Sequence, residues 1–201
     1  MLDPSDGVLL EQLSSRLHGW CIKYVPGQPR VRKCGRPGSL EAAILAELGG
    51  RAGIPPLLSM LENGEDIDGS VIELPYLDDR RAATEAELRL LVADLAASLD
   101  TLHEAGYVHR DLKRSNVRFD GRQAWLIDFD LAERWRDGDA PLLGQAGTLG
   151  WRAPEVRLGL PHSGAAADMW SLGLLVWDEL SAMLAGHDSA VSPLQLCWLH
   201  R

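Results

Sequence analysis

The stretch His109-Arg-Asp-Leu-Lys-Arg-Ser-Asn-Val-Arg-Phe119 decides how this chain is interpreted. Within it, Asp111 can accept a proton from a hydroxyl group, Lys113 can bring a positive charge to a transferred phosphate, and the amide oxygen of Asn116 can help to bind Mg²⁺. Transfer of a phosphoryl group needs an oriented hydroxyl, cations on the phosphate oxygens and groups that hold the metal. The stretch therefore indicates a phosphoryl-transfer site.

The segments on either side of this stretch support the same chemistry. Asp128 follows the strand-like segment 125–127 and can supply a second metal contact. Upstream, Thr84-x-x-Glu87 is a capping box that predicts a helix ending near Gly106. This helix carries one apolar stripe formed by Leu88, Leu91, Leu95, Leu99 and Leu102. It would deliver the chain directly to His109.

The first part of the chain is predicted to be mainly β, and the last part helical. Short apolar runs broken by Gly and Pro predict strands in residues 1–37, including Trp20–Val25. A helix is expected over Ser39–Leu48, then two strands, Ile54–Leu58 and Ser70–Leu77, joined by a turn at Asn63-Gly64. Asp168–Met183 is apolar nearly all round and predicts a helix that is buried on every side.

Composition narrows the class of protein without identifying it. The chain has 201 residues, 46% of them hydrophobic and 24% charged, as in an ordinary globular protein. A net charge of -9 argues against a general nucleic-acid or anionic-membrane binder, and the local basic run Arg30, Arg32, Lys33 and Arg36 is interpreted as a solvated loop. Three scattered cysteines and the lack of a long apolar run predict an intracellular protein, cytoplasmic or nuclear, without a membrane span.

Four motifs in a fixed order give a resemblance to the eukaryotic protein kinase family. They are His109–Asn116, Asp128-Phe-Asp130, Gly147-Thr-Leu-Gly-Trp-Arg-Ala-Pro-Glu155 and Asp168-Met-Trp-Ser-Leu-Gly173. Lys113 beside Asp111 resembles the serine/threonine type. The resemblance implies an α+β bilobal fold with a small β-rich N-lobe and hinge over residues 1–77. A mainly helical C-lobe follows over residues 78–201, and the fold is expected to be truncated at both ends.

The resemblance also implies roles for individual residues around the phosphoryl-transfer site. Asp111 corresponds to the catalytic base, and Lys113 to the cation on the transferred phosphate. Asn116 and Asp128 correspond to the ligands of Mg²⁺. Thr148 corresponds to a substrate-positioning residue. ATP, Mg²⁺ and a protein substrate are thereby implied, and an activating regulatory subunit is a candidate partner.

On the nucleotide side, Glu41 matches the helix glutamate that braces the phosphate-binding lysine of the family. Two lysines compete for that partner, and Lys23 is favoured over Lys33 because its flanks are strand-like. The resemblance implies a hinge at Leu74, Pro75 and Leu77. Leu74 would control access to the nucleotide pocket, and the backbone of the other two would face the adenine. Pro75 has no N–H, so only its carbonyl can take part.

The chain departs from the family pattern at several positions. No Gly-rich loop precedes Lys23, Asp130 stands where the family has Gly, and Arg118 stands where an apolar residue would lie under the adenine. There is no Ser, Thr or Tyr between Phe129 and Gly147 to carry an activating phosphate. Arg110 is therefore expected to pair with Asp137 or Asp139, or to stay unpaired.

The favoured function is an ATP-dependent protein serine/threonine kinase. The alternative is a pseudokinase or scaffold that keeps the fold with weak or no ATP turnover, because of Arg118, Asp130 and the missing Gly-rich loop. A small-molecule phosphotransferase of the antibiotic-kinase type is a distant third, since residues 147–155 resemble the segment that binds protein substrates. Within the family, Ala146–Val156, Ala167–Ser171 and Leu74–Leu77 resemble the cell-division-cycle kinase that licenses DNA replication.

Overall fold

A computed structural model of the chain describes residues 22–24, 29–34, 39–61 and 71–185. The expectations for residues 1–21 and for the turn at Asn63-Gly64 lie outside these ranges. The strands are β1 (Ile22–Tyr24), β2 (Arg30–Cys34), β3 (Ser59–Leu61), β4 (Val71–Pro75), β5 (Tyr107–Val108), β6 (Val117–Phe119), β7 (Ala124–Leu126) and β8 (Glu133–Arg134). The helices are α2 (Glu41–Leu48), α3 (Glu85–Glu104), η1 (Arg114–Asn116), η2 (Leu149–Trp151), α4 (Pro154–Arg157) and α5 (Gly164–Ala185).

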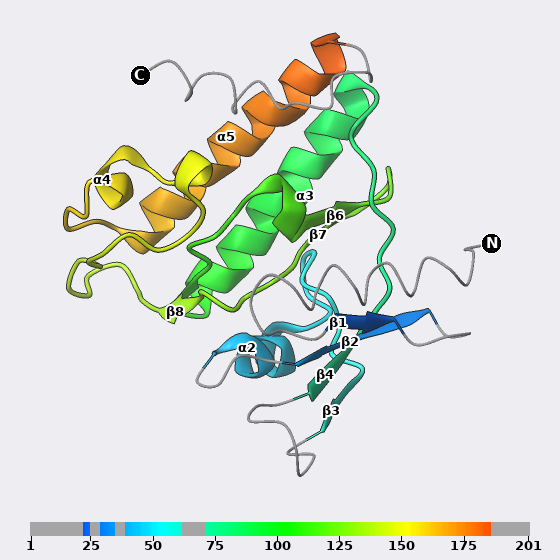
Figure 1. The fold of residues 1–201 in the computed structure, drawn as a ribbon, viewed down its shortest axis with the longest axis horizontal. Helices are drawn as coiled ribbons and strands as arrows, with labels where there is room; N and C mark the ends of the chain where they lie inside the picture. The colour runs from blue at the N-terminus through cyan, green and yellow to red at the C-terminus, as the bar shows by residue number, and fades with distance from the viewer. Residues whose placement is uncertain (1–21, 25–28, 35–38, 62–70, 186–201) are drawn as a thin grey trace.

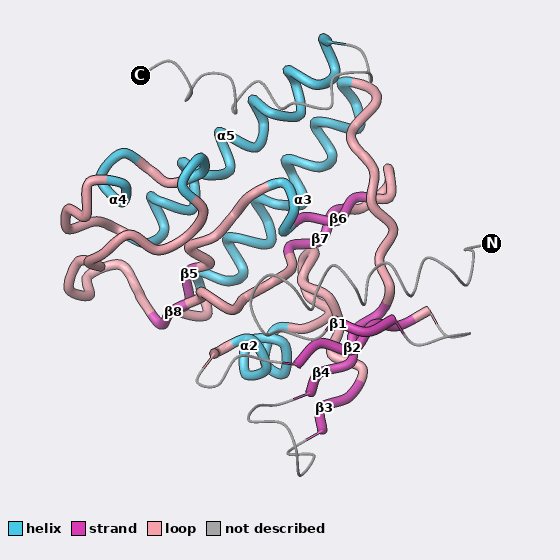
Figure 2. Tube along the Cα trace, viewed as in Figure 1, coloured by secondary structure: helices cyan, strands magenta, loops and turns pink. Residues whose placement is uncertain are grey.

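The chain has the α+β, two-lobed arrangement that was expected, with a sheet in the first lobe and helices in the second (Figures 1 and 2). The sheet has the strand order β1-β2-β4-β3, and each neighbouring pair is antiparallel. Helix α2 contributes Ile44, Leu45 and Leu48 to the main hydrophobic core. The second lobe is built around α3 and α5, which contact each other.

One predicted strand and one predicted loop are wrong. The strand expected at Ile54–Leu58 is β3, Ser59–Leu61. Pro55 and Pro56 have no N–H for a ladder, and the N–H of Ile54 closes a turn by donating to the carbonyl of Arg51 at 2.7 Å. The basic run expected as a solvated loop begins instead with β2, whose neighbour β4 offers Glu73 as an acidic partner for its arginines.

Helix α3 confirms the capping-box prediction. The Thr84 hydroxyl accepts a hydrogen bond from the N–H of Glu87 at 3.2 Å, which satisfies one of the free donors at the helix start. The five predicted leucines of the stripe are all buried. Their burial fixes the rotation of α3, so its last turn leads through Gly106 into β5 and the catalytic stretch.

Helix α5 is not buried on every side, which corrects the prediction from its apolar sequence. One face contributes Leu172 and Leu175 to the core, whereas Met169, Trp170 and Trp177 are 50%, 46% and 55% exposed. Its covered side faces α3, β5 and the segment around α4, within the part of the chain that the structure describes. Among these same residues, no helix combines the length and apolarity needed to cross a bilayer.

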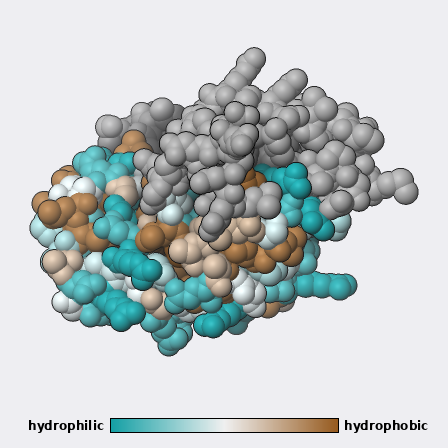
Figure 3. Space-filling view, turned by 90° about the horizontal axis from the view of Figure 1, so that it is seen from below, coloured by the Kyte–Doolittle hydropathy of each residue, from teal (hydrophilic) through white to brown (hydrophobic). Residues whose placement is uncertain are grey.

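The described surface has no single polarity. Figure 3 shows hydrophilic and hydrophobic groups intermixed over the face seen from below. Large apolar side chains that are exposed also occur around α4, at Leu143, Leu149, Leu158 and Leu160. The polar side chains that matter for chemistry lie between the lobes, where β2, α2 and the segments after β5 and β7 meet.

Candidate active site

The catalytic stretch is anchored to helix α5 by one buried carboxylate. Asp168 is 1% exposed and accepts hydrogen bonds from the backbone N–H groups of His109 and Arg110, both at 2.8 Å. Its Oδ2 also lies 2.9 Å from Nε2 of His103 on α3. Arg110 has a positive φ of 67°, a conformation that non-glycine residues rarely adopt. These contacts hold that uncommon backbone in place.

Asp111, Lys113 and Thr148 form a closed triangle of hydrogen bonds. Lys113 Nζ donates to Asp111 Oδ2 at 2.7 Å and to the Thr148 hydroxyl at 2.8 Å. The backbone N–H and the hydroxyl of Thr148 each donate to Asp111 Oδ1 at 2.8 Å. Thr148 lies 35 and 37 residues beyond Lys113 and Asp111, yet these three residues that the sequence assigned to one reaction meet at one carboxylate.

Gly147 allows this approach between the two segments. Its φ is 88°, and a Cβ at this position would collide with the carbonyl oxygen of Arg110. A side chain here would push Thr148 away from Asp111. A small pocket beside the triangle is lined by residues of both segments, including Trp151, Arg152, Ala153 and Val156.

Asn116 completes the catalytic stretch from the short helix η1. It is 4% exposed, and its Nδ2 donates to the backbone carbonyl of Asp111 at 2.9 Å. Its own carbonyl accepts a hydrogen bond from the N–H of Ile127 at 3.0 Å, so η1 is tied to the segment that carries Asp128. The two proposed metal ligands are therefore linked through the backbone.

The lysine beside Glu41 is Lys33, which corrects the preference for Lys23. Lys33 Nζ lies 2.7 Å from Glu41 Oε2 and 2.6 Å from Asp128 Oδ1. Alternate residues of a strand face opposite sides of the sheet, so Lys33 and its β4 partner Ile72 are buried toward α2 while Arg32 is exposed. The side chain of Lys23 lies outside the described residues.

Three carboxyl groups surround Lys33. Burial and the close charges change the pKa values of Lys33, Glu41 and Asp128. Burial favours the neutral amine, but Glu41, Asp128 and Asp130 outweigh it and raise the pKa of Lys33. Burial, with repulsion from the two aspartates, outweighs the attraction of Lys33 and raises the pKa of Glu41 to about 7. Burial opposes ionisation of Asp128 too, yet Lys33 lowers its pKa. The cluster is thus richer in acid than in base.

Glu41 also connects α2 to the Asp128-Phe129-Asp130 segment. Its Oε1 accepts a hydrogen bond from the N–H of Phe129 at 3.2 Å, and the Phe129 ring is fully buried in the core. Asp128 has a φ of 69°, which turns the chain sharply between β7 and Phe129. Helix α2, strand β2 with Lys33 and the Asp128–Asp130 segment are therefore positioned together.

Arg118 lies on a partly exposed face of β6, and its charged group has polar partners. It lies on β6 between the buried residues Val117 and Phe119, on the opposite, partly exposed face. Its guanidinium donates to the carbonyls of Ser115 and Val117, both at 3.0 Å, and lies 3.8 Å from Asp79. The desolvation cost expected for this arginine is therefore offset by polar partners.

The hinge residues follow directly from the end of the sheet. Leu74 and Pro75 are the last residues of β4, and they and Leu77 are partly exposed. The N–H of Tyr76 donates to the carbonyl of Pro29 at 2.8 Å, which ties this segment to β2.

Arg110 pairs with Glu133, so the expectation of Asp137, Asp139 or no partner is wrong. The two side chains are in direct contact. Burial lowers the pKa of Arg110, against the attraction of Asp168. Asp139 is used differently, as an acceptor for the backbone N–H of Arg136. The pairing of β5 with β8 sets Glu133 opposite Val108, two residues before Arg110, and no local sequence pattern announces this short pairing.

Sequence reasoning also missed a buried acidic pair on α5. Asp178 and Glu179 are 1% and 0% exposed. Arg81 reaches both of them, at 2.9 and 3.2 Å, and Arg114 Nε lies 2.6 Å from Glu179. The pair therefore ties the start of the second lobe and η1 to α5. Acidic residues inside an apolar helix pattern were the signal that could have indicated it.

Comparison with known proteins identifies the family. A family model described as the protein kinase domain matches residues 62–189. The probable serine/threonine-protein kinase fnkB of Dictyostelium discoideum is 38% identical over 125 residues, which cover 60% of this chain and 23% of that protein. Maternal embryonic leucine zipper kinase of Xenopus laevis is 33% identical over 121 residues, covering 59% and 19%. Human ribosomal protein S6 kinase alpha-1 is 38% identical over 104 residues, covering 50% and 14%.

The chain belongs to the protein kinase family, of the eukaryotic serine/threonine type. It spans between 14% and 23% of the length of the three curated relatives named above. Those relatives do not support the expected likeness to the kinase that licenses DNA replication.

Proposed function

We propose that this protein transfers the γ-phosphoryl group of ATP to a serine or threonine hydroxyl of a protein substrate. The observation that carries the proposal is the triangle of Asp111, Lys113 and Thr148. A carboxylate, an ammonium group and a hydroxyl-holding residue are brought to one point, as phosphoryl transfer to an alcohol requires. The family membership supports the same reaction class.

In this proposal the residues of the triangle divide the work at the acceptor. The Asp111 carboxylate orients the substrate hydroxyl and takes its proton. Lys113 places its charge where negative charge develops on the transferred group. Thr148, fixed through its backbone and hydroxyl, positions the substrate segment that leads to Asp111.

The nucleotide and Mg²⁺ fit the groups on the other side of the site. Mg²⁺ favours carboxylate and amide oxygens, which Asp128 and Asn116 offer from neighbouring segments. Lys33, braced by Glu41, is the group proposed for the phosphates. Leu74, the carbonyl of Pro75 and the backbone of Leu77 are proposed to hold the adenine, at a lobe boundary placed after residue 77. When bound, Mg²⁺ neutralises charge on the phosphate oxygens.

The test is phosphate transfer from labelled ATP to a generic protein substrate by the full chain. Asp111→Asn is expected to lower the rate by roughly 10²–10⁴-fold, the usual contribution of a general base. Asp137→Asn is the matched control, because it neutralises an exposed aspartate in the segment that follows β8. It should keep the wild-type rate.

The outcomes separate the candidate functions. Transfer that survives in Asp111→Asn would contradict the proposed mechanism. Nucleotide binding without transfer would favour the pseudokinase alternative, unless an added activating subunit restores transfer. Activity on a small alcohol but on no protein would favour the small-molecule phosphotransferase.

A further inference from the structure

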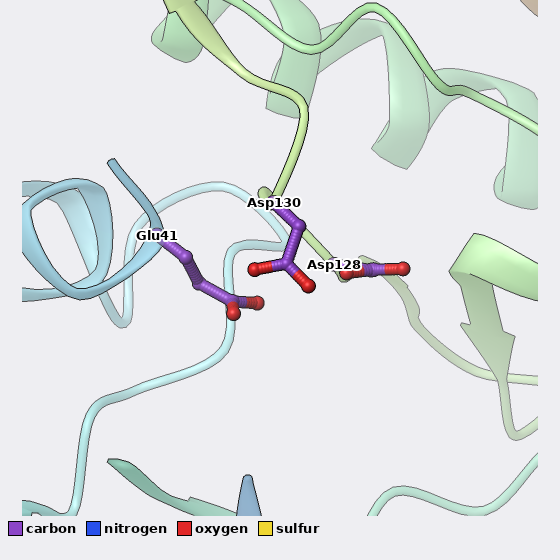
Figure 4. Close-up of side chains that lie close together, drawn as sticks. All are labelled: Glu41, Asp128 and Asp130. Atoms are coloured by element: carbon purple, nitrogen blue, oxygen red, sulfur yellow. The ribbon is translucent and has the colours of Figure 1, made fainter. Parts of the chain in front are cut away.

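Asp130 occupies a position that the kinase family gives to glycine, and its side chain points into the lysine cluster. Figure 4 shows its carboxyl group close to those of Glu41 and Asp128. Asp130 Oδ2 lies 3.0 Å from Lys33 Nζ, so Lys33 faces a third carboxylate in addition to Glu41 at 2.7 Å and Asp128 at 2.6 Å. A lysine ammonium has three N–H donors. Of these contacts, that with Asp128 Oδ1 is a hydrogen bond, and those with Glu41 and Asp130 are close ion pairs.

A second contact holds Asp130 at this place. The Ser39 hydroxyl donates to Asp130 Oδ1 at 3.3 Å and accepts a hydrogen bond from the N–H of Glu41 at 3.1 Å. One oxygen of Asp130 is therefore bound at the start of α2, while the other faces Lys33. Its side chain is 16% exposed, so solvent screens the contact only in part.

The cluster holds more acidic than basic groups. Three carboxyl groups meet one ammonium, and Lys33 is the only lysine or arginine that forms an ion pair with them among the described residues. A phosphate group adds negative charge and needs at least one of the three ammonium donors. Of the contacts to Lys33, that of Asp130 is the longest.

We propose that Asp130 competes with nucleotide phosphates for Lys33 and thereby weakens the part of nucleotide binding that depends on the phosphates. The inference rests on the proposed function, since it assumes that nucleotide binds between the lobes. Asp130 thereby determines how much more tightly the protein binds a phosphorylated nucleotide than the nucleoside without phosphate. Glu41 keeps its contact as the brace, and Asp128 would be free to hold Mg²⁺.

The experiment measures affinity rather than turnover. The full chain and its Asp130→Asn variant are titrated calorimetrically with Mg²⁺-ADP, with a Mg²⁺-bound non-hydrolysable ATP analogue, and with adenosine. Asparagine keeps the size of the side chain and removes its charge. Loss of one charged competitor is expected to tighten both phosphorylated ligands by roughly tenfold, which corresponds to about 1.4 kcal/mol. Adenosine has no phosphate, so its affinity should stay within about twofold.

Two further variants control for misfolding of the asparagine variant and for the change in net charge. Asp130→Gly, which restores the family residue, should tighten Mg²⁺-ADP in the same direction and serves if the asparagine variant does not fold. Asp137→Asn changes the net charge equally at an exposed site and should leave all three affinities unchanged.

The results that would overturn the inference are distinct from failure of the function. Unchanged or weaker ADP binding in both Asp130 variants overturns it, and so does equal tightening of adenosine and ADP. In either case nucleotide still binds, so the proposed function survives. If adenosine, ADP and the ATP analogue bind to none of the proteins, both the inference and the proposed function are wrong.

Discussion

The two ionic clusters of the site are built on opposite charge balances. Around Asp111 one carboxylate is shared by an ammonium group, a hydroxyl and a backbone N–H, all within 2.8 Å. Around Lys33 one ammonium is shared by three carboxyl groups. The first cluster is satisfied as it stands, whereas the second holds more carboxyl groups than its one ammonium group can pair, and the pKa of Glu41 is raised to about 7. The lysines of the two clusters should therefore respond differently when each is removed.

The largest expected effect comes from replacing the two lysines in turn. Lys33→Met leaves three buried or half-buried carboxyl groups facing one another, and removal of one partner from a buried ion pair costs about 3–5 kcal/mol. Lys113→Met removes one donor from Asp111 and from the Thr148 hydroxyl, but Asp111 keeps both hydrogen bonds from Thr148, so the cost should be below about 1 kcal/mol. Urea unfolding of the two variants measures the difference.

A double variant sharpens the same comparison. Asp130→Asn should recover part of the stability lost in Lys33→Met, because it removes one of the repelling carboxylates. Equal destabilisation by Lys33→Met and Lys113→Met, with no recovery in the double variant, would show that the two clusters do not differ in charge balance.

The second prediction concerns the support of the catalytic stretch. Asp168→Ala removes the acceptor of the His109 and Arg110 N–H groups, and each buried donor left unsatisfied costs about 1–3 kcal/mol. We expect a loss of about 2–4 kcal/mol in the free energy of unfolding. Asp168→Asn is the matched control, since its remaining carbonyl oxygen can still accept a hydrogen bond, and it should lose less.

The same pair of variants distinguishes the clusters by their nucleotide affinity. The Lys33 cluster does not use Asp168, so adenosine and ADP should bind folded Asp168→Asn as they bind the original chain. If Asp168→Ala were as stable as the original chain, α5 would not be what holds the uncommon backbone of Arg110.

The two clusters also differ in how far sequence could predict them. Asp111, Lys113 and Thr148 lie in motifs of fixed spacing, and the structure brings them together as those motifs implied. The preference for Lys23 as the lysine of the second cluster was wrong. Both Lys23 and Lys33 lie on strands, and strand-like neighbours in the sequence do not tell which strand places its lysine beside Glu41. Burial of Lys33 depends on pairing of β2 with β4, a contact between residues about forty positions apart.

Non-local pairing also explains the correction at Arg110. Glu133 reaches Arg110 through the two-residue pairing of β5 with β8, which carries no strong local pattern. The position of Arg118 under the adenine stays a prediction, and its long side chain carries its charge toward polar partners such as Asp79. By contrast, helix α3 was predicted well because its cap and stripe are local features.

The smallest expected effect is on a solvated ion pair outside both clusters. Glu87 accepts hydrogen bonds from the Arg80 guanidinium and from the N–H of Ala83, which lower the pKa of this carboxyl from 4.5 to about 2. The folded state thus favours the ionised form, so its stabilisation is complete above about pH 4.5 and is lost as pH falls toward 2. In Glu87→Gln, stability should decline less steeply over this window, as measured by urea unfolding at a series of pH values.

Glu85→Gln is the control, because it removes an exposed carboxylate from the same turn. It should keep the loss of stability at low pH that is due to Glu87. An identical acid dependence in Glu87→Gln and the original chain would place that dependence in the buried carboxyl clusters instead.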